Sequence, residues 1–264
     1  MKTKLEKRSP LRDKPLRVPG QSIDDQIDEL RFNTFAYFMI PFVVMALYLV
    51  NWVSQIAPHS PEAIKITPYA SAFLLGVVLL FCIYQVRKNF KKIELLKMGR
   101  DGERIVAEEL QALIKGGATV LHDIVSEKFN VDHVVVSPHG IFLVETKTYS
   151  KPVKKDAKIS FDENHVFIDG REYERNPIDQ VRASTKWLQD LLKESTGIQF
   201  PIRPVILFPG WWTEPMKRGQ NVWILNPKSL PTFISNEPIA IKETDVHLVA
   251  FHLSRYIRTF EPKK

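Results

Sequence analysis

The chain has 264 residues, of which 44% are hydrophobic and 25% charged, and a formal net charge of +7; such averages are typical of one or two soluble domains. Its single cysteine, Cys82, excludes an internal disulfide and a zinc site built from cysteines. The seven histidines include no pair at the helical spacing of metal ligands, so a zinc hydrolase is disfavoured as well.

The positive charge is concentrated at the front of the chain. Residues 1–98 contain 14 Lys and Arg against 8 Asp and Glu, whereas residues 99–264 contain 23 against 22. A high isoelectric point often indicates nucleic-acid binding. Here the excess flanks two apolar segments, so net charge gives no evidence for DNA as a partner.

Residues 32–53 and 69–86 are apolar segments without any charged residue. Each is about long enough to cross a ~30 Å hydrocarbon core as a helix, so both are predicted to span a membrane. Pro41 is expected to kink the first span, which membrane helices tolerate. Two buried helices of a soluble protein are the alternative interpretation.

Basic flanks predict the orientation of these spans. Residues 1–17 contain seven Lys and Arg and residues 87–100 contain six, whereas the connector at 54–68 carries only Glu62 and Lys65. The positive-inside rule therefore places both termini in the cytoplasm. A cleaved signal peptide fits poorly, because the first apolar segment starts late and a second one follows.

The chain is thus predicted to comprise a basic cytoplasmic tail (1–31), a two-helix transmembrane hairpin (32–86), a basic linker (87–98) and a cytoplasmic domain (99–264). Two charge-free spans are too few for a transporter, so anchorage in the lipid bilayer is expected. Pairing of the helices around Gly76 could also produce a homo-oligomer.

The cytoplasmic domain is predicted to begin with a helix at residues 99–115. Its apolar stripe includes Val106 and Leu110, and Glu103 lies on that stripe. A carboxylate on the core side of a helix must be paired, bound to a metal or close to solvent at the helix edge. The structural alternative is a charge that stabilises the helix N-terminus.

Three strand-like segments follow, at 119–122, 131–136 and 141–147, and turn residues join the last two. The second and third are largely apolar on both faces, so they are predicted to be central strands. Asp132, Glu145 and Lys147 therefore lie where an isolated charge is costliest.

The length of the loop decides whether these charges meet. Pro138 disfavours a primed two-residue turn, which leaves a loop of three or four residues. A loop of four residues pairs Val136 with Ile141 and sets Asp132 opposite Glu145, with Cβ atoms about 4.5–5.5 Å apart. Three residues would send the two acids to opposite faces.

Two opposed buried carboxylates repel one another unless a divalent cation lies between them. With Lys147 alongside, they predict a magnesium site where an activated water attacks phosphate. The alternative is a pair of acids near strand ends, satisfied by Lys147 and solvent.

Lysines at 151, 154, 155 and 158 follow the acidic site, and Asp169-Gly170 marks a hairpin after them. Lys151, Lys154 and Lys155 could guide a phosphate backbone toward the acids. A solvated loop is the equally supported alternative.

Asn176 and Pro177 are predicted to open a helix that runs to about Ser195. Gln180, in its first turn, could reach the same site. Strands at 203–208 and 222–225 and a helix at 244–256 complete the prediction. Trp211-Trp212 follows a strand end and could stack bases or form a packed or partner-facing aromatic pair.

The order of these motifs resembles the NERD (nuclease-related domain) family, a branch of the PD-(D/E)xK phosphodiesterases. The resemblance covers roughly residues 99–210. Its four motifs are Gly102-Glu103, Val131-Asp132-His133, Gly140-Ile141-Phe142 leading to Glu145-Thr146-Lys147, and Asn176-Pro177-Ile178-Asp179-Gln180. Val131 replaces the proline of the superfamily name.

The resemblance implies that Asp132 and Glu145 ligate Mg²⁺, with Mn²⁺ as the alternative, and that Glu103 completes or orients the metal shell. It also implies that Lys147 positions or deprotonates the attacking water and that Gln180 is an accessory contact. The implied α/β fold is a restriction-endonuclease-like core, with a central mixed sheet flanked by helices.

The leading hypothesis is a membrane-anchored, Mg²⁺-dependent nuclease in the bacterial inner membrane that acts on nucleic acid, DNA rather than RNA. The alternative is a catalytically inactive, membrane-tethered nucleic-acid-binding or scaffold domain. The near-neutral cytoplasmic domain supports that alternative, because a processive DNA enzyme is expected to have a broad cationic face.

Overall fold

The computed structural model describes residues 13–56, 68–152, 157–173, 176–216 and 219–262. They form two compact units, of which one contains Ile23–Met98 and the other combines residues 13–22 with those from Gly99 onward. The charges up to Arg12 and in the connector (Glu62 and Lys65), on which the predicted orientation partly rests, lie outside the described residues.

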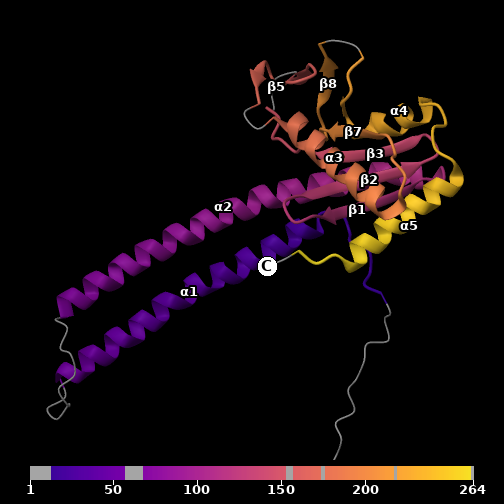
Figure 1. The fold of residues 1–264 in the computed structure, drawn as a ribbon. Helices are drawn as coiled ribbons and strands as arrows, with labels where there is room; N and C mark the ends of the chain where they lie inside the picture. The colour runs from indigo at the N-terminus through magenta and orange to yellow at the C-terminus, as the bar shows by residue number, and fades with distance from the viewer. Residues whose placement is uncertain (1–12, 57–67, 153–156, 174–175, 217–218, 263–264) are drawn as a thin grey trace, which may run out of the picture. The chain divides into compact units, whose positions relative to one another are not determined.

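The unit Ile23–Met98 consists of parts of two long helices, α1 (Gln21–Ile56) and α2 (Pro68–Lys115), which run side by side (Figure 1). Asn89 Nδ2 donates a hydrogen bond to Thr34 Oγ1 at 3.0 Å between them. Both helices are long and apolar enough to cross a membrane. Apolar side chains such as Phe42 and Leu80 stay exposed, which a soluble helix pair would avoid.

Both helices extend beyond the apolar segments. The residues predicted as a linker, 87–98, are helical and continuous with the helix expected at 99–115. Nothing in residues 87–98 would stop a helix, since they contain neither Gly nor Pro and are rich in Lys, Leu and Glu.

The second unit contains a mixed α/β domain (Figure 1). Its main sheet has the order β1-β2-β3-β7-β9, with the first three strands antiparallel and the last three parallel. The strands are β1 (Thr119–Val125), β2 (Asn130–Ser137), β3 (Gly140–Thr146), β7 (Ile202–Leu207) and β9 (Trp223–Leu225). The predicted central mixed sheet is confirmed.

A smaller sheet has the order β6-β5-β4-β8. Its strands are β4 (Lys158–Phe161), β5 (Val166–Ile168), β6 (Arg171–Glu172) and β8 (Trp212–Pro215). Asp169 and Gly170 join β5 to β6 with positive φ angles of 50° and 78°, the conformation expected of an Asp-Gly hairpin. The strand β8, which the sequence did not reveal, pairs in parallel with β4.

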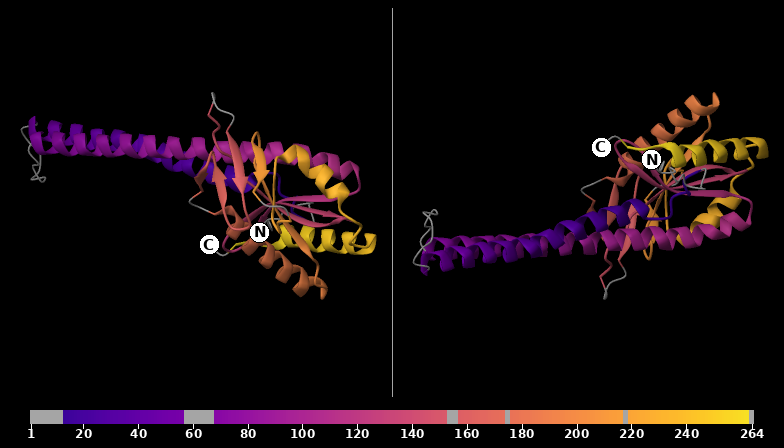
Figure 2. Two further views of the ribbon diagram at one scale, coloured as in Figure 1. Left: turned by 90° about the horizontal axis from the view of Figure 1, so that it is seen from above. Right: turned by 90° about the horizontal axis from the view of Figure 1, so that it is seen from below.

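Helices cover both faces of the main sheet (Figure 2). On one face, Leu143 and Ile206 belong to a core with Leu188 of α3 (Pro177–Thr196) and Val249 of α5 (Glu243–Thr259). On the other face, the core combines Phe142 and Val205 with side chains of α2 and of α4 (Leu230–Asn236), which follows a short 3₁₀ turn, η1 (Pro227–Ser229). Burial on both faces explains the nearly continuous apolar strands.

The β2–β3 register is the one expected for a four-residue loop, with Val136 paired to Ile141, and the three-residue alternative is excluded, but the loop is shorter than expected. Pairing continues to Ser137 and Gly140, so only Pro138 and His139 connect the strands. Gly140 takes the positive φ of 142° that Pro138 cannot adopt. Two-residue and four-residue loops have the same parity, so the shorter loop leaves the register unchanged.

Candidate active site

Asp132 is left out of the pairing of β2 with both neighbouring strands. The pairs between β2 and β3 end at His133 and Val144, and the register continued by one residue sets Asp132 opposite Glu145. The Asp132 carboxylate instead accepts a hydrogen bond from the Thr146 backbone N–H at 2.7 Å. This side chain therefore takes the place of a main-chain partner for the Thr146 N–H of β3.

On the other side of β2, the pairing with β1 skips one position. His122 pairs with His133 and Ile124 with Val131, but Asp123, with a φ of +50°, is left out of the β1–β2 pairing. A positive φ at a residue other than glycine is uncommon and marks a local break in a strand. Asp132 therefore lacks a paired residue on both sides, although β1 and β2 pair again at Ile124 and Val131.

Glu145, Lys147 and Gln180 form a closed triangle of hydrogen bonds. Glu145 Oε1 accepts from Lys147 Nζ at 2.8 Å and from Gln180 Nε2 at 2.6 Å. Lys147 Nζ also donates to Gln180 Oε1 at 2.8 Å. The other carboxylate oxygen, Glu145 Oε2, is buried and has no hydrogen-bond partner among the described residues.

Glu103 reaches the same region from α2 and is buried. The residue before it, Gly102, has no room for a side chain, since a Cβ there would lie 1.9 Å from Thr148 Oγ1, just after β3. Only glycine lets α2 approach that segment so closely. The Gly102-Glu103 motif therefore combines a close helix contact with a carboxylate on the buried side.

The three acids act on one another electrostatically. Burial, followed by the charges of Asp123 and Glu145, raises the pKa of Glu103 to about 7. Burial and then the charges of Glu145 and Glu103 hold the pKa of Asp132 well above its usual range. Burial also raises the pKa of Glu145, against the opposing effect of Lys147. Glu103, Asp132 and Glu145 are therefore one coupled cluster.

The carboxylates of Glu103, Asp132 and Glu145 are the kind of ligands that a hard divalent cation binds. Carboxylate oxygens are the ligands that Mg²⁺ and Mn²⁺ prefer, and a cation would offset the mutual repulsion. The unpartnered Glu145 Oε2 provides one such ligand. However, no three His, Cys, Asp or Glu side chains among the described residues are already arranged around one metal position.

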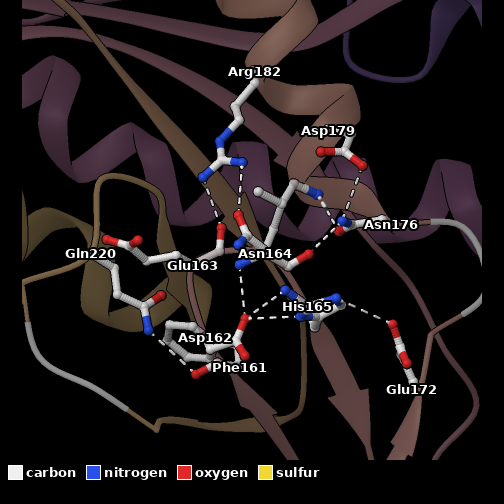
Figure 3. A network of polar contacts seen from close by, with 11 residues as sticks. Phe161, Asp162, Glu163, Asn164, His165, Glu172, Asn176, Asp179, Arg182 and Gln220 are labelled. Carbon is white, nitrogen blue, oxygen red and sulfur yellow. Dashed lines mark hydrogen bonds and ion pairs between the residues drawn. The ribbon is translucent and has the colours of Figure 1, made fainter.

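A network of polar contacts fixes the start of α3 and with it Gln180 (Figure 3). Asn176 caps the helix, since its Oδ1 accepts from Ile178 N at 3.1 Å while its Nδ2 donates to the Asn164 carbonyl at 2.5 Å. Arg182 Nη2 donates to the Glu163 carbonyl at 2.8 Å. The turn between β4 and β5 is thereby bound to the first turns of α3.

Two features near this site were not predicted from the sequence. Asp123 is buried and pairs with Arg17, whereas the predicted strand stopped at His122. His122 and His133 face each other, with their Nδ1 atoms 2.9 Å apart, and burial lowers the pKa of both. The strand-like sequence around Asp123 could have indicated that this acid belongs to a buried strand.

The predicted cationic rim is described only in part. Lys151 is exposed, and its Nζ lies 5.8 Å from the ring centroid of Trp211. Lys154 and Lys155 lie outside the described residues. Trp211 is packed, with its Nε1 donating to the Tyr149 carbonyl at 3.2 Å, while Trp212 is exposed.

A known protein family matches the part of the chain that contains the four motifs. Residues 98–209 match the family model of the nuclease-related domain. No curated protein and no solved structure matches the chain. The match spans the four motifs and the elements from the end of α2 to β7. Residues 98–209 of this chain are thus a NERD, or nuclease-related, domain.

Proposed function

We propose that this protein is a membrane-anchored, metal-dependent phosphodiesterase that cleaves nucleic acid, DNA rather than RNA. The observation that carries the proposal is the coupled cluster of Glu103, Asp132 and Glu145 beside Lys147. Buried acids that repel one another next to a lysine are costly for folding, and such arrangements are concentrated at functional sites. The nuclease-related domain supports nucleic acid as the substrate class.

In this proposal Asp132 and Glu145, with Glu103 completing or orienting the shell, would hold Mg²⁺ or Mn²⁺. A metal held there supplies charge neutralisation at the scissile phosphate and lowers the pKa of a water. Hydrolysis then joins the water oxygen to phosphorus and breaks one phosphorus–oxygen ester bond, which releases an alcohol.

Lys147 is proposed to hold that water or to stabilise the charge that develops on the phosphate. An ammonium group has three donors, and two of those of Lys147 point to Glu145 and Gln180. The third donor is left for the water or a phosphate oxygen. Gln180 keeps the ammonium group in place as an accessory contact.

The proposed organisation is the cytoplasmic tail (1–31), the transmembrane hairpin (32–86), the linker (87–98) and the nuclease-like domain (99–264). The two long apolar helices support anchorage. The basic flanks support a cytoplasmic domain at a bacterial inner membrane, and helix pairing could produce a homo-oligomer.

A second candidate function is an inactive nucleic-acid-binding or scaffold domain on the same anchor. It is favoured by the ion pair between Lys147 and Glu145, in which the lysine already satisfies one carboxylate oxygen. It also accommodates the lack of a preformed three-ligand set in the described part of the chain. A scaffold should be indifferent to chelators.

The test uses the full chain in detergent micelles with Mg²⁺ or Mn²⁺ and linear, circular and single-stranded DNA and RNA. We expect DNA cleavage that chelator, Glu145→Gln and Lys147→Ala each abolish. Glu194→Gln, which changes an exposed glutamate of α3, is the matched control and should cleave normally. A wild-type chain that neither binds metal by calorimetry nor cleaves any substrate would favour the scaffold.

A further inference from the structure

A pocket of about 430 Å³ lies beside β9, the last strand of the main sheet. Its walls carry three aromatic side chains, Trp212 of β8, Trp223 of β9 and Phe233 of α4. The Trp223 and Phe233 rings form a T-shaped pair with centroids 5.5 Å apart, whereas Trp212 is 71% exposed. A concave site of this size with aromatic walls is typical of a pocket that binds a small organic group.

The register of the parallel strands places this pocket close to the candidate active site. Glu145 of β3 pairs with Ile206 of β7, which pairs in turn with Ile224 of β9. Ile224 lines the pocket. Neighbouring strands lie about 4.8 Å apart, so Ile224 is about 10 Å from Glu145 across the sheet. A stacked strand of nucleic acid advances about 3.4 Å per nucleotide, so this distance corresponds to roughly three nucleotides.

Hydrogen bonds fix the pocket wall relative to the end of β3. Trp211 Nε1 donates to the Tyr149 carbonyl at 3.2 Å, and Asn226 Nδ2 donates to the Trp211 carbonyl at 2.9 Å. Asn226 lines the pocket, and Tyr149 follows Lys147 after one intervening residue. The buried Trp211 therefore connects the pocket to the segment that contains the candidate catalytic lysine.

Polar and charged groups accompany the aromatic walls. Thr213 and Ser229 add hydroxyl groups to the lining, and a hydroxyl can donate or accept a hydrogen bond at the polar edge of a base. Two lysines are exposed nearby, since Lys228 precedes Ser229 in the chain and Lys151 lies against Trp211. A purely apolar ligand would use neither kind of group, whereas a nucleotide has a flat ring, polar edges and a phosphate.

We infer that this pocket binds one unpaired nucleobase of the substrate strand, stacked on Trp212, while a phosphate roughly three nucleotides away lies at Glu145. This inference rests on the proposed function, because the bound strand is the one that the acids cleave. Stacking on an aromatic ring accepts any base, so the pocket favours strand structure over sequence. A base inside a duplex must leave the stack before it can enter a pocket, so single-stranded segments and frayed ends are preferred.

The experiment measures cleavage of a single-stranded DNA by the full chain in detergent micelles with Mn²⁺. Trp212→Ala should raise KM about 10-fold, because truncating the ring removes the stacking on one base. The kcat should stay unchanged, since this contact is equally strong before and during the reaction. Trp212→Phe keeps a ring and should recover most of the loss. Phe251→Ala, which removes an exposed ring of α5 outside the pocket, is the matched control and should behave as the wild type does.

A second measurement links the effect to a base. An abasic nucleotide is placed at one position of the strand at a time, and the wild type should lose affinity at a position about three nucleotides from the scissile phosphate. Trp212→Ala should bind that abasic strand no more weakly than the intact strand, because groups in contact have non-additive effects. If Trp212 served only folding, the two losses would add and the melting temperature would fall.

The outcomes separate the pocket from the proposed function. Cleavage with an unchanged KM in folded Trp212→Ala would overturn the pocket and leave the proposed function standing. If the wild type does not cleave, the same variants are compared by the dissociation constant of the intact strand. Binding that depends on Trp212 and on one base would then overturn the proposed function and leave the pocket standing. A chain that neither binds nor cleaves DNA would overturn both.

Discussion

Two polar clusters of the domain meet the same helix, α3, and differ in what they do to their acids. In the turn network of Figure 3, backbone N–H groups of Asn164 and His165 donate to Asp162 and lower its pKa. In the cluster around Glu145, burial raises the pKa of each acid, and like charges raise it further at Glu103 and Asp132. One cluster stabilises its carboxylate, whereas the other leaves its carboxylates in an unfavourable environment.

This difference separates a structural role from a functional one. A network that satisfies its charges needs nothing further, and its purpose is to hold the first turn of α3. A cluster whose acids repel one another is stable only because the rest of the fold maintains it, and a cation would relieve the repulsion. Substitutions in one cluster, with the other cluster as the control, therefore test this difference.

The largest expected effect is on catalysis. Asp132→Ala or Glu145→Ala should reduce metal-dependent cleavage by at least about 100-fold, because each change removes a carboxylate from the proposed metal shell. Both variants should stay folded, since each loses a charge that repels its neighbours. Cleavage rates and circular dichroism of the full chain test this directly.

Asp162→Asn provides the comparison within the turn network. It keeps an oxygen that can accept from the Asn164 and His165 N–H groups, so cleavage should stay at the wild-type level. Full activity in both Asp132→Ala and Glu145→Ala would remove the basis for the site assignment.

The next effect concerns pH and stability without metal. Unfolded Glu103 releases its proton near pH 4.5, whereas in the folded chain its pKa is about 7. The folded state therefore binds more protons between these values, and the free energy of unfolding should fall as pH rises through this window. The shift corresponds to roughly 3 kcal/mol.

Thermal unfolding of the full chain at pH 5, 6, 7 and 8 measures this effect. Glu103→Gln should flatten the decline, and Mg²⁺ should counteract it above pH 7 by binding the ionised cluster. Asp162→Asn should leave the decline as it is. A melting temperature that rises from pH 5 to pH 8 in metal-free protein would contradict the assignment of a raised Glu103 pKa.

A smaller effect is expected at the helix contact that brings Glu103 into place. Gly102→Ala would put a Cβ 1.9 Å from Thr148 Oγ1, which should cost about 1–3 kcal/mol and displace α2. Thr148→Ala removes the obstructing hydroxyl, so the double variant should regain most of the lost stability and activity. Equal stability of Gly102→Ala and wild type in thermal unfolding would show that the contact is looser.

The local part of the site could be predicted from the sequence. Strand alternation with an even loop length sets Asp132 opposite Glu145 with Lys147 nearby, although the sequence left an odd length open, and the helix start at Asn176 placed Gln180. Parity survives an error in loop length when the error is an even number of residues, as happened at Pro138 and His139.

The long-range part could not be predicted. The Arg17–Asp123 pair joins residues 106 positions apart, and no periodicity connects them. Asp123 also has a positive φ, which breaks the alternation by which a strand is recognised, so the predicted strand ended too early. The parallel pairing of β4 with β8 could not be predicted from the sequence for the same reason, since β8 is distant from β4 along the chain.

The smallest expected effect lies in the turn network itself. Asn176→Ala removes the cap of α3 and the bond to the Asn164 carbonyl, and should cost about 1 kcal/mol of stability. Activity should fall only slightly, because the Asn176 cap acts on Lys147 only through Gln180 and the acids stay in place. Asn176→Asp keeps the capping oxygen and should restore most of the stability. If Asn176→Ala instead abolished cleavage as completely as Glu145→Ala while remaining folded, the turn network would belong to the catalytic machinery, and the division between the two clusters would be wrong.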